Sequence, residues 1–531
     1  MTAMTCGEAA ISLLEQHGVD TVFGIPGVHT LDFYRGLGRS KMRHIGIRHE
    51  QGAGYMADGY ARASGRPGVC VLITGPGVTN AATPIGQSYS DSVPVLLLSS
   101  VNETEHLGKG RGRLHEITDQ RAVMAPLTGL SRTVRTPDDL PLAIDAAFEM
   151  FATARPRPAH VEVPLDVLAM PASDRPATHS TKKRPTPTDK EIAAAAAIVD
   201  AAKAPFVIAG GGTVDCAAAL AALVERIDAD VAVTVAAKGV LPASHPNSLG
   251  STLLQASTQK AIEEADLVIA VGTELSETDS WTDRLPIRGR IVRIDIDRPT
   301  LTRDYKPDAA IFGDAGGTRA GLATAGARKQ PSNSRARARD EIRRRNAEER
   351  PPLQMKHVRV LDAMRKAVPE NGTFATDMTQ IAYTANYHFP MSQPRRWFHP
   401  TGFGTLGYAL PAAIGAKLAT PERPTVAVVG DAGFLFTVQE LATAVEQKLP
   451  LAILLWNNDA LGQIADDMIR LGIPEIGVKP RNPDYLALAR AFGANAVRAD
   501  SAGSLQDALS GAFQAGGPTL IEVRQDAAWL A

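Results

Sequence analysis

Two polar residues follow apolar runs in the last third of the chain. Asp431 comes directly after TVAVVG, and Asn458 follows the run LAILLW. In a parallel sheet, strands joined by a right-handed crossover end at the same edge, so we expect both side chains to meet in the crevice there. Carboxylate and amide oxygens, with a nearby backbone carbonyl, suit Mg²⁺, which usually completes its shell with phosphate oxygens and water. The pattern therefore predicts a metal ion that clamps a diphosphate group.

The glycines beside the acid fit the same prediction. Gly430 and Gly433 carry little bulk, so a helix starting near Phe434 is expected to bring its N-terminal N–H groups close to the anion. A simpler interpretation stays open, in which Asp431 only caps this helix and Asn458 only belongs to a turn.

The elements around these residues predict three α/β units. Residues 1–170 alternate apolar strands such as VCVLITG with helical segments, and the alternation restarts over 189–325 and again over 356–531. We expect each unit to form a doubly wound parallel sheet covered by helices. Residues 171–188, rich in Pro, Ser, Thr and basic residues, predict an extended connection. The polar segment 326–355 predicts a second linker with a solvated helix, because its Arg residues alternate with acids; a nucleic-acid arm fits less well.

The composition points to small-molecule partners. With 531 residues and a formal net charge of -1, the chain can bury several cores and offers no broad basic surface for nucleic acid or an anionic membrane. Cys6, Cys70 and Cys216 form no CxxC or Cys/His cluster, so the sequence indicates neither a disulfide framework nor a structural zinc site, and it fits a reducing cytoplasm. No apolar run approaches the roughly 18 residues of a membrane span, and the N-terminus has no signal-peptide pattern.

Longer motifs add a resemblance to a known family. The Gly-Asp and Asn-Asn pairs, together with GTLGYALPAAIGAKLA at 404–419 and RHEQGAGYMADGYARASGRPGVC at 48–70, resemble the thiamine-diphosphate enzymes of the acetolactate synthase/2-oxo acid decarboxylase group. The resemblance spans the whole chain and is strongest in the first and third units. The chain departs from the family at Ala432, where glycine is usual, so the loop is expected to sit slightly differently over the diphosphate.

The resemblance implies a set of cofactor contacts. Asp431, the Asn458 side chain and the Ala460 carbonyl would hold Mg²⁺. Gly404 matches the position whose carbonyl accepts a hydrogen bond from the aminopyrimidine, and Leu406 matches the bulky residue that bends the cofactor. Further contacts are implied for Pro26, Gly430, Ala432, Gly433 and Ile464.

Glu50 matches the family glutamate that hydrogen-bonds N1′ of the aminopyrimidine. Protonation there favours the tautomer whose exocyclic nitrogen removes the thiazolium C2 proton. On the residue alone, an acid that stabilises a helix N-terminus is the preferred interpretation, and the surrounding motif reverses this preference in favour of catalysis. The family places this glutamate and the metal site on different subunits, so the resemblance implies at least a homodimer, and tetramers are common in the group.

Two departures count against acetolactate synthesis. Residues 273–277 read TELSE where acetolactate synthases carry an Arg-Phe-Asp-Asp-Arg stretch near FAD, so FAD is not expected. Residues 114–116 read LHE where those enzymes have Phe-Gln-Glu. The lone glycine cluster AGGGTVD in the middle unit favours a tight strand-to-helix turn over a nucleotide site.

The helix expected after Asn458 carries the candidate substrate residues. Gln463, Ile464, Asp467 and Met468 fall on one helix face. Asp467 stands where acetolactate synthases place a Trp, and a carboxylate there would favour a guanidinium tail. This pattern resembles the 2-ketoarginine decarboxylases of arginine catabolism, although Asp467 and its neighbour could instead form an exposed acidic pair.

His29 and His115 are candidates for protonating the species left after CO₂ loss, and each could instead be structural. We expect non-oxidative decarboxylation of a 2-oxo acid to an aldehyde. A carboligase of the acetolactate synthase type is the alternative. Intact Glu50, Asp431 and Asn458 argue against a non-catalytic binding module, and a dinucleotide-dependent oxidoreductase would rest on the middle-unit glycines alone.

Overall fold

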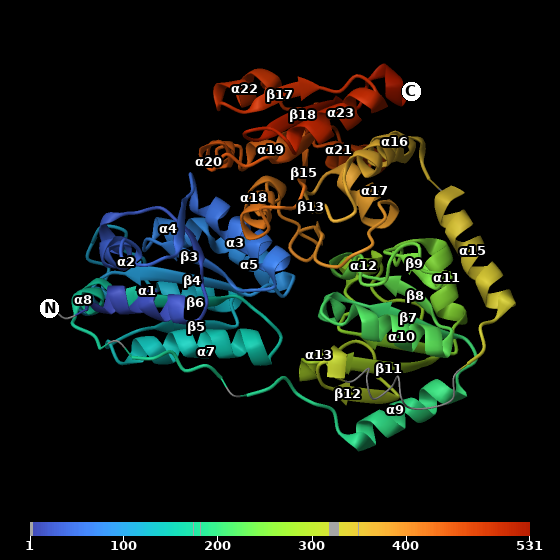
Figure 1. Cartoon of the computed structure of the whole chain (residues 1–531), viewed down its shortest axis with the longest axis horizontal. Coiled ribbons are helices and arrows are strands. Elements are labelled where there is room, and N and C mark those ends of the chain that lie inside the picture. The colour runs from blue at the N-terminus through green and yellow to red at the C-terminus, as the bar shows by residue number, and fades with distance from the viewer. Residues whose placement is uncertain (1–3, 174, 181, 318–328, 349) are drawn as a thin grey trace.

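The computed structural model contains three parallel six-stranded sheets, each interleaved with helices (Figure 1). It describes residues 4–173, 175–180, 182–317, 329–348 and 350–531. The predicted fold class, three doubly wound α/β units, is confirmed. We call these the first, middle and third units, in chain order.

The first unit has the strand order β2-β1-β3-β4-β6-β5. Its strands are β1 (Thr21–Gly24), β2 (Arg43–Gly46), β3 (Gly68–Leu72), β4 (Val95–Val101), β5 (Leu130–Thr133) and β6 (Ala159–Pro164). Its helices are α1 (Cys6–Gln16), α2 (Leu31–Leu37), α3 (Glu50–Ser64), α4 (Pro76–Asn80), α5 (Ala82–Ser90), α6 (Gln120–Met124), α7 (Asp139–Thr153) and α8 (Leu165–Ala169). Every residue of β3 and β4 is buried, as expected for central parallel strands covered on both faces.

The middle unit has the order β12-β11-β10-β7-β8-β9. Its strands are β7 (Pro205–Ala209), β8 (Asp230–Val233), β9 (Ser248–Gly250), β10 (Leu267–Val271), β11 (Arg290–Asp295) and β12 (Ala309–Phe312). Its helices are α9 (Asp189–Ala201), α10 (Ala217–Ile227), α11 (Ala256–Glu264), α12 (Glu277–Ser280) and α13 (Arg298–Thr302). The predicted glycine turn follows β7 and begins a short 3₁₀ helix at Gly211.

The third unit has the order β14-β13-β15-β16-β18-β17. Its strands are β13 (Thr373–Thr376), β14 (Trp397–Phe398), β15 (Thr425–Gly430), β16 (Ala452–Asn457), β17 (Asn495–Arg498) and β18 (Thr519–Arg524). Its helices are α16 (Pro352–Ala367), α17 (Gln380–His388), α18 (Ala409–Ala419), α19 (Asp431–Leu435), α20 (Glu440–Glu446), α21 (Gly462–Arg470), α22 (Tyr485–Ala491) and α23 (Ala502–Ala512). The alternation of buried strands and helices fits the apolar runs that the sequence shows.

Helices α3 and α18 join the first unit to the third unit of the same chain (Figure 1). They approach so closely that a Cβ at Gly59 would lie 2.0 Å from the carbonyl oxygen of Ala412, and a Cβ at Gly415 would lie 1.9 Å from that of Met56. Glycine at both positions therefore allows direct backbone contact between the helices.

Polar contacts attach the middle unit to the other two. Lys238 is buried and donates to the Ala385 and Asn386 carbonyls at the end of α17, at 3.1 and 2.7 Å. Arg155 of the first unit pairs with Glu274 of the middle unit at 2.6 Å. The middle unit is thus held against both neighbours.

The predicted linkers differ from each other. The described part of 171–188 contains no helix and no multi-residue strand. The second linker contains α15 (Asn333–Glu348), which confirms a helix there. This helix is not solvated all round, because the Arg339 guanidinium is buried and pairs with Asp228 and Asp230 at 3.0 and 2.9 Å. Within the described ranges, no helix has the length and apolar character needed to cross a bilayer.

Candidate active site

The candidate metal residues lie at the ends of two neighbouring strands. Strand β15 pairs in parallel with β16, with Gly430 opposite Trp456, so both strands end at the same edge. Asp431 follows the first strand and is only 2% exposed. Asn458 follows the second strand directly. The observed register therefore brings the two strand ends side by side, as expected for strands joined by a right-handed crossover.

Asp431 is surrounded by donors and has a neighbouring negative charge. Asn482 Nδ2 donates to the Asp431 carboxylate at 2.9 Å, and the Tyr485 hydroxyl donates to its backbone oxygen at 2.9 Å. Burial raises the pKa of the Asp431 carboxyl, and the charge of Asp459 adds to this effect. A buried carboxylate near a second acid is a site that a cation would stabilise.

The segment after β16 is a tight turn. Asn457 Oδ1 accepts from the Asp459 N–H at 3.1 Å, and Asn458 Oδ1 accepts from the Ala460 N–H at 3.2 Å. Asp459 itself has a left-handed φ of 54°. Asn458 Nδ2 faces the Gln380 amide oxygen at 3.4 Å, so the side chain is held beside the strand end. Turn and ligand roles are therefore compatible for Asn458.

The donor chemistry fits a magnesium diphosphate. Within the described residues, there is no cluster of three or more His, Cys, Asp or Glu side chains able to bind a metal. A metal here would instead use one carboxylate plus amide and carbonyl oxygens, the set that magnesium accepts. In addition, the buried Asn482 Oδ1 beside Asp431 has no hydrogen-bond partner within the described residues, so the site retains an unused acceptor.

The helix expected near Phe434 begins earlier. Helix α19 starts at Asp431 itself, with Gly430 as its N-cap, and has only five residues. The expectation was wrong because Asp431 adopts helical geometry at once instead of belonging to the preceding loop. Gly430 is needed at the cap, since a Cβ there would lie 2.8 Å from Thr379 Oγ1.

The loop before α18 carries the other predicted cofactor residues. Gly404 has a φ of 67°, a backbone conformation that favours glycine. The Leu406 side chain lies 3.7 Å from the point where a Cβ on Gly433 would stand. The Gly407 N–H donates to both Asp377 oxygens, at 3.1 and 3.0 Å. Burial raises the pKa of Asp377 to about 6. Leu406 is thus placed beside Gly433, shortly after the end of β15.

Glu50 lies in the first unit, at the N-terminus of α3. Its Oε2 accepts from Asn80 Nδ2 at 3.0 Å, and a helix N-terminus favours a carboxylate. The two preceding N–H groups, of Arg48 and His49, donate to Glu440 Oε1 in α20 at 3.1 and 2.9 Å. Burial raises the pKa of Glu440 to about 6. The end of α3 that carries Glu50 is therefore docked on the third unit of its own chain.

The two candidate histidines lie side by side. His29, in the 3₁₀ turn Val28–Thr30, and His115 have ring centroids 5.2 Å apart. Burial, and secondarily the His115 charge, lower the pKa of His29. Each ring has a buried Nδ1 without a hydrogen-bond partner within the described part of the chain. His115 also has a left-handed φ of 60°, which is uncommon for this residue type. Pro26 lies just before this turn and is exposed.

The candidate substrate face lies on α21. Gln463 donates to one Asp467 oxygen at 3.3 Å, which places both side chains on one face as predicted from their spacing. The other Asp467 oxygen accepts from Arg470 at 2.9 Å, and this hydrogen bond lowers the pKa of Asp467. Ile464 is 49% exposed on the same helix. In a single chain, Asp467 therefore already binds a guanidinium at the surface.

Several residues beside these sites were not predicted from the sequence. Asn482 and Tyr485 contact Asp431 from more than 50 positions away. Gln380 links Asn458 to Asp466, and Asp377 holds the loop of Gly404. Gln380, Asn482 and Tyr485 follow no apolar strand and belong to no spaced motif, so only the tertiary fold identifies them. Asp377 directly follows β13, as Asp431 follows β15, and this position is the signal that could have identified it.

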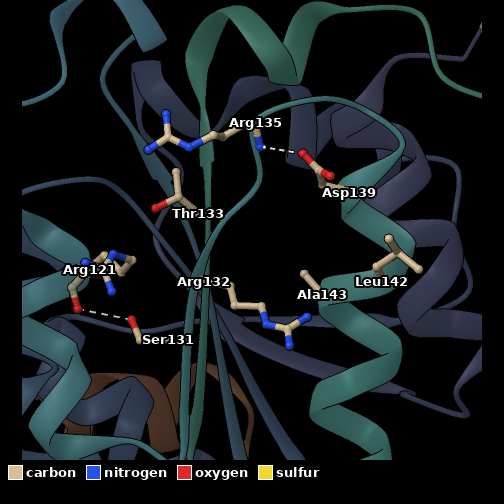
Figure 2. Close-up of a pocket in the computed structure, with 8 residues that line it drawn as sticks. All are labelled: Arg121, Ser131, Arg132, Thr133, Arg135, Asp139, Leu142 and Ala143. Carbon is tan, nitrogen blue, oxygen red and sulfur yellow. Dashed lines mark hydrogen bonds between the residues drawn. The ribbon is translucent and has the colours of Figure 1, made fainter.

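A large hollow lies elsewhere, at the outer edge of the first sheet (Figure 2). It has a volume of about 430 Å³ and is lined by Arg121, Ser131, Arg132, Thr133, Arg135, Asp139, Leu142 and Ala143. In Figure 2 the Arg121 and Arg132 side chains lie on opposite sides of edge strand β5. Because these cations do not converge, they fit the charged protection of an open sheet edge better than a catalytic site.

Comparisons with known proteins agree with this geometry. Three parts of the chain match thiamine pyrophosphate enzymes: the N-terminal TPP binding domain at residues 4–123, the central domain at 192–322 and the C-terminal TPP binding domain at 377–523. The chain therefore belongs to the thiamine pyrophosphate enzyme family, whose cofactor is thiamine diphosphate.

Individual relatives cover nearly the whole chain. The probable 2-ketoarginine decarboxylase AruI of Pseudomonas aeruginosa is 51% identical over 534 residues, which is 98% of this chain and 94% of the relative. The acetolactate synthase isozyme 1 large subunit of Escherichia coli is 32% identical over 98% of this chain and 94% of its own length. A probable acetolactate synthase large subunit of Methanocaldococcus jannaschii is 31% identical over 99% and 92%.

Proposed function

We propose that this protein is a thiamine-diphosphate-dependent decarboxylase that converts a 2-oxo acid to an aldehyde and CO₂, with 2-ketoarginine as the favoured substrate. One observation carries the proposal: the buried Asp431 and the Asn458 side chain end neighbouring strands in a domain that matches a TPP binding domain. The relative named as a 2-ketoarginine decarboxylase supports the choice of reaction.

In this proposal, Asp431, Asn458 and the Ala460 carbonyl hold Mg²⁺ on the cofactor diphosphate. When bound, the cofactor supplies the electron sink for the electrons left as CO₂ departs. The Gly404 carbonyl and Leu406 orient its aminopyrimidine, and Glu50 holds a proton at the ring nitrogen. Pro26, Gly430, Ala432, Gly433 and Ile464 contribute contacts around it. Ala432 adds one methyl group to the loop at the diphosphate.

The active site is proposed to form between two subunits. Large apolar side chains are exposed near both parts of the proposed site in the single chain. In the first unit, beside the histidines, these are Val28 (64% exposed), Leu31 (57%) and Leu114 (61%). In the third unit they are Phe436 (52%) and Ile469 (62%). Exposed apolar groups of this size favour burial against another chain. A homodimer that closes Glu50 of one subunit over Asp431 of the other would cover them, and we propose that dimers pair into tetramers in the cytoplasm.

For the substrate, the proposal assigns Asp467 and Gln463 to the distal end of the 2-oxo acid. A carboxylate binds a guanidinium in a bidentate way and repels acidic side chains. The pairing of Asp467 with Arg470 supports this role, because the carboxylate already binds one guanidinium. A guanidino substrate would then take the place of the Arg470 side chain.

His29 and His115 are proposed to serve proton transfer after CO₂ loss. Their rings are close together, and each retains a buried nitrogen that makes no hydrogen bond to the described residues. Burial lowers the pKa of His29, which favours its neutral form, so this ring can accept a proton and pass one on from its other nitrogen.

A carboligase of the acetolactate synthase type is the second candidate, favoured by the relatives that are 29–32% identical. The 51% relative favours decarboxylation instead. The two are separated by incubating the protein with pyruvate and testing for acetolactate. A bound flavin would give a yellow protein and would favour the carboligase.

The decisive assay is a panel of 2-oxo acids, including 2-ketoarginine, pyruvate and phenylpyruvate, scored for CO₂ release with added thiamine diphosphate and Mg²⁺. We expect the fastest release from 2-ketoarginine. Glu50→Gln should abolish turnover while largely sparing cofactor binding. Turnover that is unchanged in Glu50→Gln, or no CO₂ release from any acid, would refute the assignment.

A further inference from the structure

Helix α3 carries two further charged residues besides Glu50, namely Asp58 and Arg62. Asp58, which is fully buried, lies two turns after Glu50, and Arg62, whose side chain is 12% exposed, lies one turn later; both contact Tyr408 of the third unit. Arg62 donates to Asp58 at 2.6 Å and to Asp91, at the end of α5, at 2.7 Å. Two carboxylates therefore share one buried guanidinium, and they need further donors to satisfy their oxygens.

Two of those donors come from the loop that carries Gly404 and Leu406, and Ser88 of α5 donates to the other Asp58 oxygen at 2.9 Å. The Tyr408 hydroxyl donates to Asp58 Oδ1 at 2.6 Å, and the Gly402 N–H donates to Asp91 Oδ1 at 2.9 Å. The two carboxylates thus bind the loop just before Gly404 and just after Leu406.

Gln87 adds a third attachment. Its amide donates to Asp91 Oδ2 at 2.8 Å, and its oxygen accepts from the Thr405 hydroxyl at 3.2 Å. Thr405 lies between Gly404 and Leu406. The opposite side of the loop is bound within the third unit, where Gly407 contacts Asp377 and Thr437.

We propose that Asp58, Arg62 and Asp91 form a positioning network for the cofactor loop of the same chain. The proposal rests on the function proposed above, in which Gly404 and Leu406 orient the aminopyrimidine. Helix α3 then has two tasks. Glu50, its first residue, acts in the site formed with the third unit of the partner subunit. Asp58 and Arg62 position the loop in the third unit of their own chain.

A purely structural role would differ in one respect. If the network only joined the two units, weakening it would lower stability without a specific effect on the cofactor. As a positioning network, it holds Gly404 and Leu406 where they meet the aminopyrimidine, so weakening it raises the amount of cofactor needed and leaves substrate recognition intact.

The chain offers a matched pair of tyrosines for the test. Tyr408→Phe removes the hydroxyl that binds Asp58. Tyr60→Phe removes a hydroxyl on α3 itself, which donates to Asp20 at 2.5 Å, and no described contact of Tyr60 reaches the loop. Both substitutions delete one oxygen that hydrogen-bonds a carboxylate. The cost to stability is expected to be larger for Tyr408→Phe, because Asp58 is fully buried whereas Asp20 is half-exposed, so cofactor affinity and loop exchange are the readouts that are compared.

We expect Tyr408→Phe to raise the thiamine diphosphate dissociation constant about tenfold, equivalent to about 1.4 kcal/mol, since the lost bond is to a charged group. At saturating cofactor, its KM for the 2-oxo acid should stay at the wild-type value. Hydrogen exchange of the cofactor-free protein should be faster over residues 402–408. Tyr60→Phe should change neither cofactor affinity nor this exchange.

Gln87→Met provides a second variant, and it should shift cofactor affinity in the same direction. Wild-type cofactor affinity and loop exchange in both Tyr408→Phe and Gln87→Met would overturn the proposal, as would an equal loss in Tyr60→Phe. If the wild-type protein binds no thiamine diphosphate, the proposed function fails instead, so the two failures are distinguishable.

Discussion

Adding a single methyl group at Gly59 tests the contact between α3 and α18. A Cβ there would lie 2.0 Å from the Ala412 carbonyl oxygen and 2.7 Å from its carbonyl carbon and Cα. These obstacles are backbone atoms, so no side chain can turn away. To restore ordinary contact, the helices must separate by about 1 Å or more.

The expected cost follows from these distances. Overpacking a dense interface costs about 1–3 kcal/mol, and a backbone obstacle places Gly59→Ala near the upper end. The better helix propensity of alanine offsets about 1 kcal/mol. We therefore expect a net loss of about 2 kcal/mol, together with lower turnover, because α3 carries Glu50.

Gly511→Ala is the matched control. Gly511 lies in α23, and a Cβ there would meet nothing within 4 Å, so this variant reports the helix propensity alone. Urea denaturation followed by far-ultraviolet circular dichroism should give a lower midpoint for Gly59→Ala and an equal or higher one for Gly511→Ala. A Gly59→Ala midpoint as high as that of Gly511→Ala would refute the packing argument.

Two further predictions concern the charges of the site. Burial raises the pKa of Asp431, so its ionised form destabilises the fold at neutral pH, and this cost disappears as the pH falls through the raised pKa. Asp431→Asn should therefore raise the urea midpoint of the cofactor-free protein at pH 7, with a gain that shrinks toward about pH 4, while magnesium-dependent cofactor binding, measured by titration, is lost; no gain at pH 7 would contradict this. Asp467→Trp should shift the preference among 2-oxo acids away from 2-ketoarginine, whereas Arg470→Gln should lower the KM for 2-ketoarginine. An unchanged preference in Asp467→Trp, together with an unchanged KM in Arg470→Gln, would show that Asp467 does not belong to the substrate site.

The long central strands could be predicted from the sequence because their pattern is local. β4 and β16 begin with the apolar runs VLLL and AILLW, which parallel sheets bury on both faces. Edge strands such as β5 and β17 could not be predicted, because they are four residues long, partly exposed and polar in sequence. Their strand conformation depends on pairing with β6 and β18.

The candidate site shows the same division. Asp431 and Asn458 could be placed because each follows a recognisable strand. Asn482 could not, since it reaches Asp431 from a loop without periodicity. From the sequence, Gly59 indicates only a weak point in a helix. The need for glycine there comes from the Ala412 carbonyl, which lies in another unit and leaves no room for a Cβ.

The central claim, a site made by two subunits, is tested most directly by complementation between two inactive variants. Glu50→Gln and Asp431→Asn are co-expressed with different affinity tags, and CO₂ release is measured on the mixed population. If the site is shared, each mixed dimer contains one intact site, so random pairing restores about a quarter of wild-type activity. If both residues act within one chain, every site carries a defect, and the mixture stays as inactive as the separate variants.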